Sequence, residues 1–138
     1  SKARCIGAGL DVVPIQLNPN VKHINLTDNK IATVYSTLSF YYMLETLDIS
    51  NNALETLGTK NFITQENLRK LYLGWNELTT IPPEIGQLIN LRILYLGRNK
   101  ITIIPPEIGQ LTNLRELYLY GSIQIPIEIH LLPNIRIN

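Results

Sequence analysis

The sequence predicts a single α/β solenoid, in which short parallel strands form one side and short helical or 3-10 turns return the chain on the other. The first observation is a near duplication: IPPEIGQLINLRILYL begins at residue 81 and IPPEIGQLTNLRELYL at residue 104, 23 residues later. The second is a spacing of apolar residues that recurs from residues 21, 44, 68, 91 and 114. A fixed period of this length is typical of stacked repeats.

Each repeat contains an L-x-L alternation, which predicts a short strand with one buried face. All copies run the same way around their coil, so their strands stack in parallel. The full pattern is L-x-x-L-x-L-x-x-N-x-L, and a fifth copy, Leu114-Leu117-Leu119, breaks down where Ser122 replaces the asparagine. The four intact copies are Val21-Ile24-Leu26-Asn29-Ile31, Leu44-Leu47-Ile49-Asn52-Leu54, Leu68-Leu71-Leu73-Asn76-Leu78 and Leu91-Leu94-Leu96-Asn99-Ile101.

The return segments have a different periodicity. Ile81, Ile85 and Leu88 are three to four residues apart, which favours a helical turn over a second strand. Pro82-Pro83 fixes how that turn begins. The motif asparagines occupy one register after the strands. We interpret them as architecture and not as a binding stripe, because a buried amide can satisfy the backbone groups that a sharp turn leaves unpaired.

This motif resembles the leucine-rich-repeat family over nearly the whole chain. The resemblance implies a curved right-handed superhelix with the parallel sheet on its concave side. We expect one domain over residues 1–138, with a partial N-terminal cap at 1–20, repeats over 21–121, and a degenerate C-terminal coil at 122–138.

Two parts of the chain resemble different branches of that family. Cys5, Leu10 and Val13-Pro14 resemble the N-terminal caps of secreted animal proteins such as Toll-like receptors and variable lymphocyte receptors. In those caps the cysteine pairs with an upstream cysteine, so this cap is either incomplete or without its disulfide, and Cys5 is otherwise a small buried hydrophobe. The second repeat, with Phe62 on its return side, also resembles the extracellular type. The IPPEIGQL segments resemble cytosolic scaffolds related to Ras-suppressor proteins, and bacterial and plant repeat proteins.

The binding residues are expected among the side chains that alternate with the buried leucines. Tyr72, Tyr95 and Tyr118 stand in one column, one per coil, and tyrosine often dominates interface energies. The alternative is that tyrosine pairs only stabilise the sheet. We expect Gly74 and Gly97 to leave room for a ligand beside this column. The remaining candidate ligand-binding residues are Trp75, Tyr120, Arg98, Lys70 and Asp48.

Composition excludes several classes of function. The 12 basic and 11 acidic residues nearly cancel, so we expect neither nucleic-acid binding nor attraction to an anionic membrane. No apolar run is long enough to insert into a membrane. His23 and His130 are far apart along the stack and no catalytic or metal-ligating group converges, so we expect no enzyme, no cofactor and no metal.

The leading hypothesis is an extracellular or cell-surface module, of the kind used in receptor and immune recognition, that binds a protein or glycan on its concave face. Asn25-Leu26-Thr27 is a glycosylation sequon that weakly supports secretion. A cytosolic scaffold and an enzyme inhibitor are the alternatives. The apolar tail, from Ile123 to Leu132, predicts that the uncapped C-terminal end is covered by further sequence or by a second copy in a homodimer.

Overall fold

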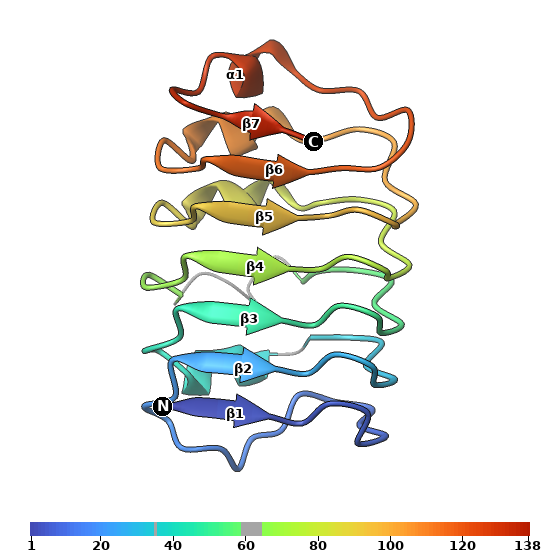
Figure 1. The fold of residues 1–138 in the computed structure, drawn as a ribbon, viewed down its shortest axis with the longest axis vertical. Coiled ribbons are helices and arrows are strands. Elements are labelled where there is room, and N and C mark those ends of the chain that lie inside the picture. The colour runs from blue at the N-terminus through green and yellow to red at the C-terminus, as the bar shows by residue number, and fades with distance from the viewer. Residues whose placement is uncertain (35, 59–64) are drawn as a thin grey trace.

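The computed structural model describes residues 1–34, 36–58 and 65–138, and shows coils stacked along one axis (Figure 1). Its strands form one parallel sheet whose order follows the sequence from β1 to β7. The fold class predicted from the repeat is therefore confirmed. The strands are β1 (Lys2–Arg4), β2 (His23–Asn25), β3 (Thr46–Asp48), β4 (Lys70–Tyr72), β5 (Ile93–Tyr95), β6 (Glu116–Tyr118) and β7 (Arg136–Ile137).

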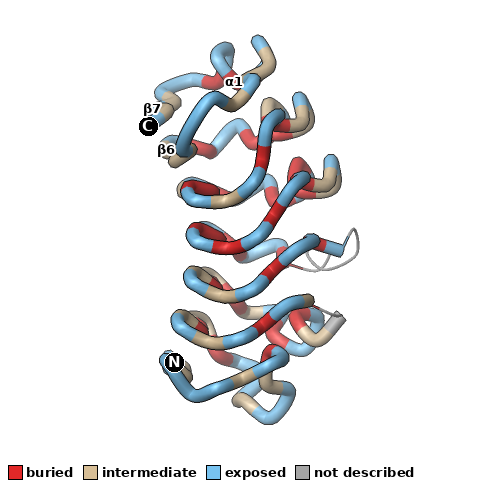
Figure 2. Tube along the Cα trace, turned by 90° about the vertical axis from the view of Figure 1, so that its right-hand side faces the viewer, coloured by how far each residue is buried: buried red, intermediate tan, exposed pale blue. Residues whose placement is uncertain are grey.

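The motif leucines form the core. In the coil of β4, for example, Leu68, Leu71 and Leu73 are fully buried. Figure 2 shows buried positions recurring at the same places in successive coils. Because each strand pairs in register with the next, Leu47 lies beside Leu71 and the core is continuous along the stack.

Short 3-10 helices return the chain on the side opposite the sheet. They are η1 (Ser36–Phe40), η2 (Pro83–Gln87) and η3 (Pro106–Gln110), and the α-helix α1 (Ile127–His130) continues the series. Pro82 caps η2 with extended backbone, as its fixed φ allows. Gly86 is required by the next coil, because a Cβ there would lie 2.5 Å from the Glu107 carbonyl oxygen.

The asparagine register is architectural, as predicted. In the buried Asn76, Nδ2 donates to the carbonyls of Ile49, Leu73 and Gly74, and Oδ1 accepts from the Leu54 amide. Each such side chain therefore joins its own coil to the preceding one. Asn29, Asn52 and Asn99 repeat this arrangement.

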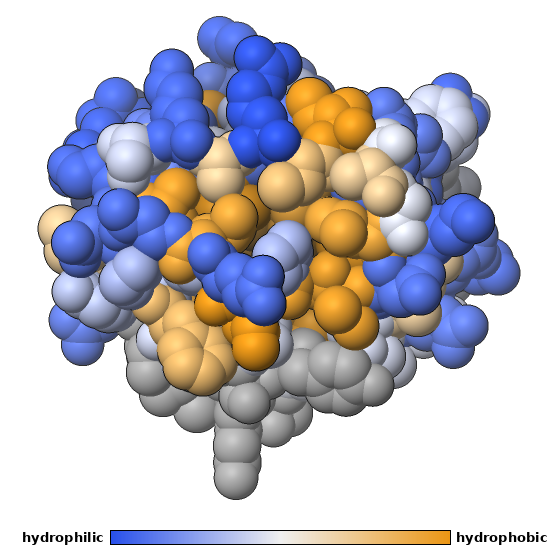
Figure 3. All heavy atoms as spheres, turned by 90° about the horizontal axis from the view of Figure 1, so that it is seen from below, coloured by the Kyte–Doolittle hydropathy of each residue, from blue (hydrophilic) through white to orange (hydrophobic). Residues whose placement is uncertain are grey.

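The N-terminal residues form a coil of the solenoid. β1 extends the sheet, and Asn29 donates to the Cys5 carbonyl and accepts from the Leu10 amide, as its counterparts do in later coils. Cys5 is half-buried against the core. Val12 and Ile15 are exposed in this coil, and Figure 3 shows an apolar area at this end of the stack, with hydrophilic side chains to its left, to its right and above it.

The C-terminal tail completes one more coil. Ile129 and Leu132 are buried, whereas Ile127 and Leu131 remain exposed. The tail thus covers part of the core below it and presents new apolar side chains of its own. The predicted return-side position of Phe62 lies outside the described residues.

Candidate functional site

The exposed face of the sheet displays side chains in straight rows, because every strand pairs in register with its neighbours. One row begins with Arg4, Asn25 and Asp48 and continues into three tyrosines, and the row beside it begins with Lys2 and His23. The three tyrosines, Tyr72, Tyr95 and Tyr118, are called the tyrosine strip below.

The tyrosine strip is half-exposed and partly stacked. The rings of Tyr95 and Tyr118 are stacked, with centroids 5.1 Å apart and an interplanar angle of 22°. Tyr72 lies beside Tyr95 in register. Burial raises the pKa of Tyr72 above its ordinary value, and the negative charge of Asp48 acts in the same direction. In the described part of the chain all three tyrosines are partly exposed, so their rings are accessible to a partner.

The hydroxyl of Tyr118 donates a hydrogen bond to the carboxylate of Glu116, on the same strand. This bond raises the pKa of Tyr118, because it favours the protonated phenol. The bond also fixes the orientation of the last ring of the strip.

Gly74 and Gly97 do not leave room for a ligand, and this expectation was wrong. The ring of Tyr95 lies over both glycines: a Cβ on Gly74 would be 2.6 Å from Tyr95 Cε1, and a Cβ on Gly97 would be 3.1 Å from it. The absence of a side chain at both glycines therefore makes room for one edge of the Tyr95 ring. Sequence spacing could not reveal this, because the ring reaches the preceding coil.

A second feature borders the strip. The guanidinium carbon of Arg98 lies 3.6 Å from the ring centroid of Tyr120 and 5.0 Å from that of Trp75. Trp75 is 56% exposed and Tyr120 is 57% exposed, so a large apolar area faces solvent around the positive charge of Arg98. Trp75, Arg98 and Tyr120 are called the Arg98 cluster below. The sequence placed these residues near the strip but did not predict their mutual stacking.

The backbone beneath the Arg98 cluster adopts an unusual conformation. Trp75 and Arg98 have φ values of 55° and 59°, in the left-handed region, as Asp28 and Asn51 do at the same position of earlier coils. Asparagine and aspartate tolerate this region, whereas it is strained for a bulky side chain. The Trp75 amide donates to the Gly97 carbonyl at 2.9 Å, which holds the turn in place. Large residues at this position therefore have an energetic cost that the fold does not require.

The other half of the face contains a hollow of about 390 Å³, lined by residues of β1 to β4. We call it the β1–β4 hollow. Three of the predicted ligand-binding residues, Asp48, Lys70 and Tyr72, line it. Asp48 and Lys70 therefore belong to this half of the face, away from the Arg98 cluster. Sequence analysis missed Lys2 and Arg4. The signal was available: Ala3-x-Cys5-x-x-Ala8-x-Leu10 repeats the motif spacing with small residues in place of leucine and asparagine.

Asn25 also lines this hollow and is half-buried. Its Oδ1 accepts hydrogen bonds from the Thr27 amide at 3.0 Å and the Thr27 hydroxyl at 2.9 Å. Asp48 makes the corresponding contact with the Ser50 amide, at 2.9 Å. Both side chains are therefore held at the carboxyl ends of their strands.

Among the described residues, no group of three or more histidine, cysteine or acidic side chains is placed to hold a metal ion. In the same residues, no helix has the length and apolar character needed to cross a membrane.

Comparison with known proteins agrees with this geometry. The family model described as "Leucine-rich repeat region" matches residues 20–136. The chain therefore belongs to the leucine-rich-repeat family, as its motif indicated.

The relatives include animal proteins. Human oligodendrocyte-myelin glycoprotein is 43% identical over 53 residues, which are 38% of this chain and 12% of that protein. Chicken Tsukushi is 26% identical over 87 residues, 61% of this chain and 24% of that protein. The chain thus spans less than a quarter of the length of these curated relatives.

Two solved structures resemble the fold. The Drosophila Toll–Spatzle complex contains a chain that matches 80% of this protein, with 33% identity and a TM-score of 0.74, over 16% of its own length. A leucine-rich-repeat protein of Leptospira interrogans matches 94% of this chain at 26% identity, with a TM-score of 0.71, over 40% of its length.

Proposed function

We propose that this chain is a non-catalytic recognition module that binds a protein ligand on the exposed face of its sheet, through the tyrosine strip and the Arg98 cluster. The observation on which the proposal depends is the set of large, fixed and accessible aromatic side chains on that face: the stacked Tyr95 and Tyr118, with Trp75 and Tyr120 around Arg98.

Tyrosine, tryptophan and arginine are the residues that most often dominate the energy of protein interfaces. They bury a large area while losing little conformational entropy, especially when they are already held by stacking. A purely structural role explains less. Cross-strand aromatic pairs stabilise a sheet by roughly 0.2–1 kcal/mol, whereas a bulky residue in left-handed backbone costs about 1–2 kcal/mol. Stability alone therefore favours glycine, asparagine or aspartate in place of Trp75.

The experiment that tests this proposal begins by identifying the partner. A photo-crosslinking phenylalanine at Tyr95 would label proteins bound to the face, with the same group at Ile89, an exposed return-side residue, as the control. The dissociation constant of a protein labelled only from Tyr95 is then measured for wild type and variants. We expect Tyr95→Ala to weaken binding by about tenfold or more.

Ile89→Ala is the matched control, since it also removes exposed apolar surface and should leave binding unchanged. Unchanged affinity in each of Tyr72→Ala, Tyr95→Ala and Tyr118→Ala, with their melting temperatures preserved, would exclude the tyrosine strip. If the exposed face binds a purified oligosaccharide, and still does so when no partner protein is present, its ligand is a glycan.

We further propose that the module works outside the cell or on its surface, as part of a receptor-like protein. One matched relative is named a glycoprotein, and the Toll structure is described as a hub of Drosophila development and innate immunity in complex with Spatzle. Surface biotinylation of the source cells and mass spectrometry of their medium should then recover the protein. Recovery from the cytosol alone would favour the scaffold alternative.

A further inference from the structure

The β1–β4 hollow has an unbalanced set of charges. Lys2, Arg4 and Lys70 contribute three positive charges to its lining, and Asp48 contributes one negative charge. Across the described ranges of the chain, the ion pairs join Lys22 to Glu45 and Lys100 to Glu77, so none of the four lining charges is neutralised by a salt bridge. A recess lined mostly by one sign of charge concentrates the field and attracts ions of the other sign.

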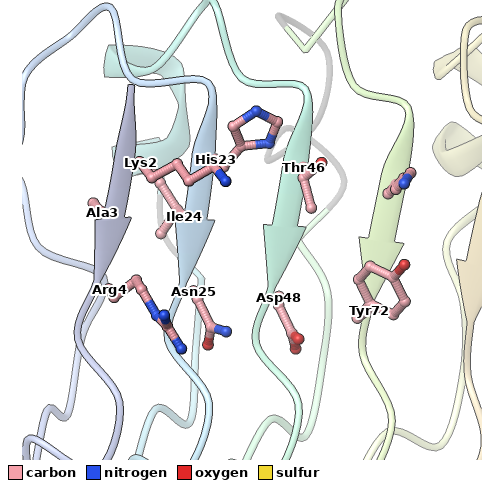
Figure 4. Close-up of a pocket in the computed structure, with 10 residues that line it drawn as sticks. Lys2, Ala3, Arg4, His23, Ile24, Asn25, Thr46, Asp48 and Tyr72 are labelled. Carbon is pink, nitrogen blue, oxygen red and sulfur yellow. The ribbon is translucent and has the colours of Figure 1, made fainter.

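The positive groups approach the hollow from both of its ends. Figure 4 shows Arg4 on β1 beside Asn25 and Asp48, in the row that ends at Tyr72, and Lys2 in the next row with His23 and Thr46. Lys70 lies on β4, in the row of Lys2. Because neighbouring strands lie about 4.8 Å apart, one carboxylate near β1 would meet Lys2 and Arg4, and a second near β4 would meet Lys70. The Asn25 and Thr46 side chains lie between them as further polar contacts.

The pattern favours a few carboxylates over a continuous polyanion. A sulfated polysaccharide or a nucleic acid needs positive charge along its whole path, whereas Asp48 interrupts one row and Glu116 lies further along the other. Tyr72 borders the hollow and begins the tyrosine strip, so a segment seated here would continue onto aromatic surface. That combination fits a peptide with acidic and apolar residues.

We propose that the β1–β4 hollow binds an acidic segment of the protein ligand, and that Arg4 and Lys70 hold its carboxylates. The inference rests on the proposed function, in that both use the same face of the sheet. It adds the chemistry of the ligand: a segment rich in aspartate or glutamate that extends along the face toward the tyrosine strip.

The test uses the chain produced in bacteria, which leaves Asn25 unmodified, and a fluorescein-labelled peptide of alternating glutamate and glycine. Fluorescence anisotropy should detect binding that weakens with added salt, and the same peptide with glutamine in place of glutamate should bind at least about tenfold more weakly. The double variant Arg4→Gln/Lys70→Gln should lose about tenfold or more in affinity. Arg4→Lys/Lys70→Arg keeps both charges and should retain most of it.

Two further variants control for general electrostatics. Arg92→Gln removes an exposed charge that does not line the hollow, so its affinity should equal that of wild type. Asp48→Asn keeps the oxygen that accepts from the Ser50 amide and removes the unfavourable charge, so it should bind about twofold to fivefold more tightly. Equal binding of the two peptides, or an unchanged affinity in the folded Arg4→Gln/Lys70→Gln variant, would overturn the proposal.

The outcome is distinguishable from that of the proposed function. Tyr95→Ala should leave the glutamate peptide bound, because Tyr95 does not line the hollow. If Tyr95→Ala loses affinity for the partner but the wild type does not prefer the glutamate peptide, the proposed function is retained and the acidic ligand is rejected. A heparin fragment that binds more tightly than the peptide, and equally well to wild type and Asp48→Asn, would assign the hollow to an anionic glycan and contradict the inference.

Discussion

The two halves of the exposed sheet face are built on one register and display different chemistry. From β1 to β4 the rows present Lys2, Arg4 and Lys70 around a hollow, whereas from β4 to β6 they present the tyrosine strip, with Tyr95 and Tyr118 stacked. Both halves share the in-register parallel strands, and each contains two of the four ladder asparagines, Asn29 and Asn52 in one and Asn76 and Asn99 in the other. The repeat thus determines where side chains stand on the face, and the residues that alternate with the leucines determine what each half can recognise.

The substitution with the largest predicted effect removes the hydrogen bonds between the coils of β3 and β4. Asn76 donates to three carbonyls and accepts from the Leu54 amide, and so joins the coils of β3 and β4. Asn76→Ala should reduce the free energy of unfolding by about 3 to 5 kcal/mol, because each buried group left unpaired costs about 1 to 3 kcal/mol. Chemical denaturation measures this.

Asn90→Ala is the matched control for that substitution. Asn90 is exposed and donates one bond, to the Glu66 carbonyl at 2.7 Å. Its loss should cost no more than about 1 kcal/mol. Equal destabilisation by the two alanine variants would contradict the architectural role of the buried asparagine.

A smaller effect is expected from filling the space beneath the stacked rings. Gly74→Ala places a Cβ 2.6 Å from Tyr95 Cε1, so the ring must move and its stacking with Tyr118 is lost. We expect a destabilisation of about 1 to 3 kcal/mol and weaker partner binding, with glutamate-peptide binding unchanged. Gly97→Ala, where the nearest ring atom is 3.1 Å away, should have a milder effect. A Gly74→Ala protein that binds its partner like wild type would show that the ring position is irrelevant to recognition.

These positions also show how much the sequence could predict. The strands, their register and the asparagine ladder could be predicted from the spacing of the motif residues, because each depends on residues within one repeat. The first coil was not predicted as a repeat, because Ala3, Cys5 and Ala8 replace the larger motif residues. Lys2 and Arg4, on its strand, were therefore not predicted as binding residues. The place of the Tyr95 ring depends on a rotamer that reaches the preceding coil, and no pattern within one repeat encodes that.

In the Arg98 cluster, a substitution that preserves or increases stability should weaken partner binding. Trp75→Asn relieves about 1–2 kcal/mol of left-handed strain and removes a cation–π contact worth about 0.5–1 kcal/mol at an exposed site. We therefore expect stability to be unchanged or increased by up to about 1 kcal/mol, measured by thermal melting, while partner affinity falls. A clear loss of stability with unchanged affinity would make Trp75 a structural residue.

The smallest effect concerns the ionisation of the strip. Glu116→Gln removes the negative charge beside the Tyr118 hydroxyl, so the pKa of Tyr118 should fall toward its ordinary value. In the wild type, the raised pKa means that the stabilisation from this contact is present below the ordinary tyrosine pKa and is lost as the pH rises through the raised value. Carbon NMR of the tyrosine rings across alkaline pH measures the shift, with Tyr118→Phe for assignment. An identical titration of Tyr118 in wild type and variant would exclude this contact as the cause.

Hydroxyl-radical footprinting of the tyrosines, with and without the partner identified by crosslinking, shows whether the tyrosine strip is the docking surface. Tyr42, which is 52% exposed on the return side, provides an internal control in the same sample. We expect the oxidation of Tyr72, Tyr95 and Tyr118 to fall in the complex while that of Tyr42 is unchanged. Protection of Tyr42 with continued oxidation of the strip would contradict this expectation.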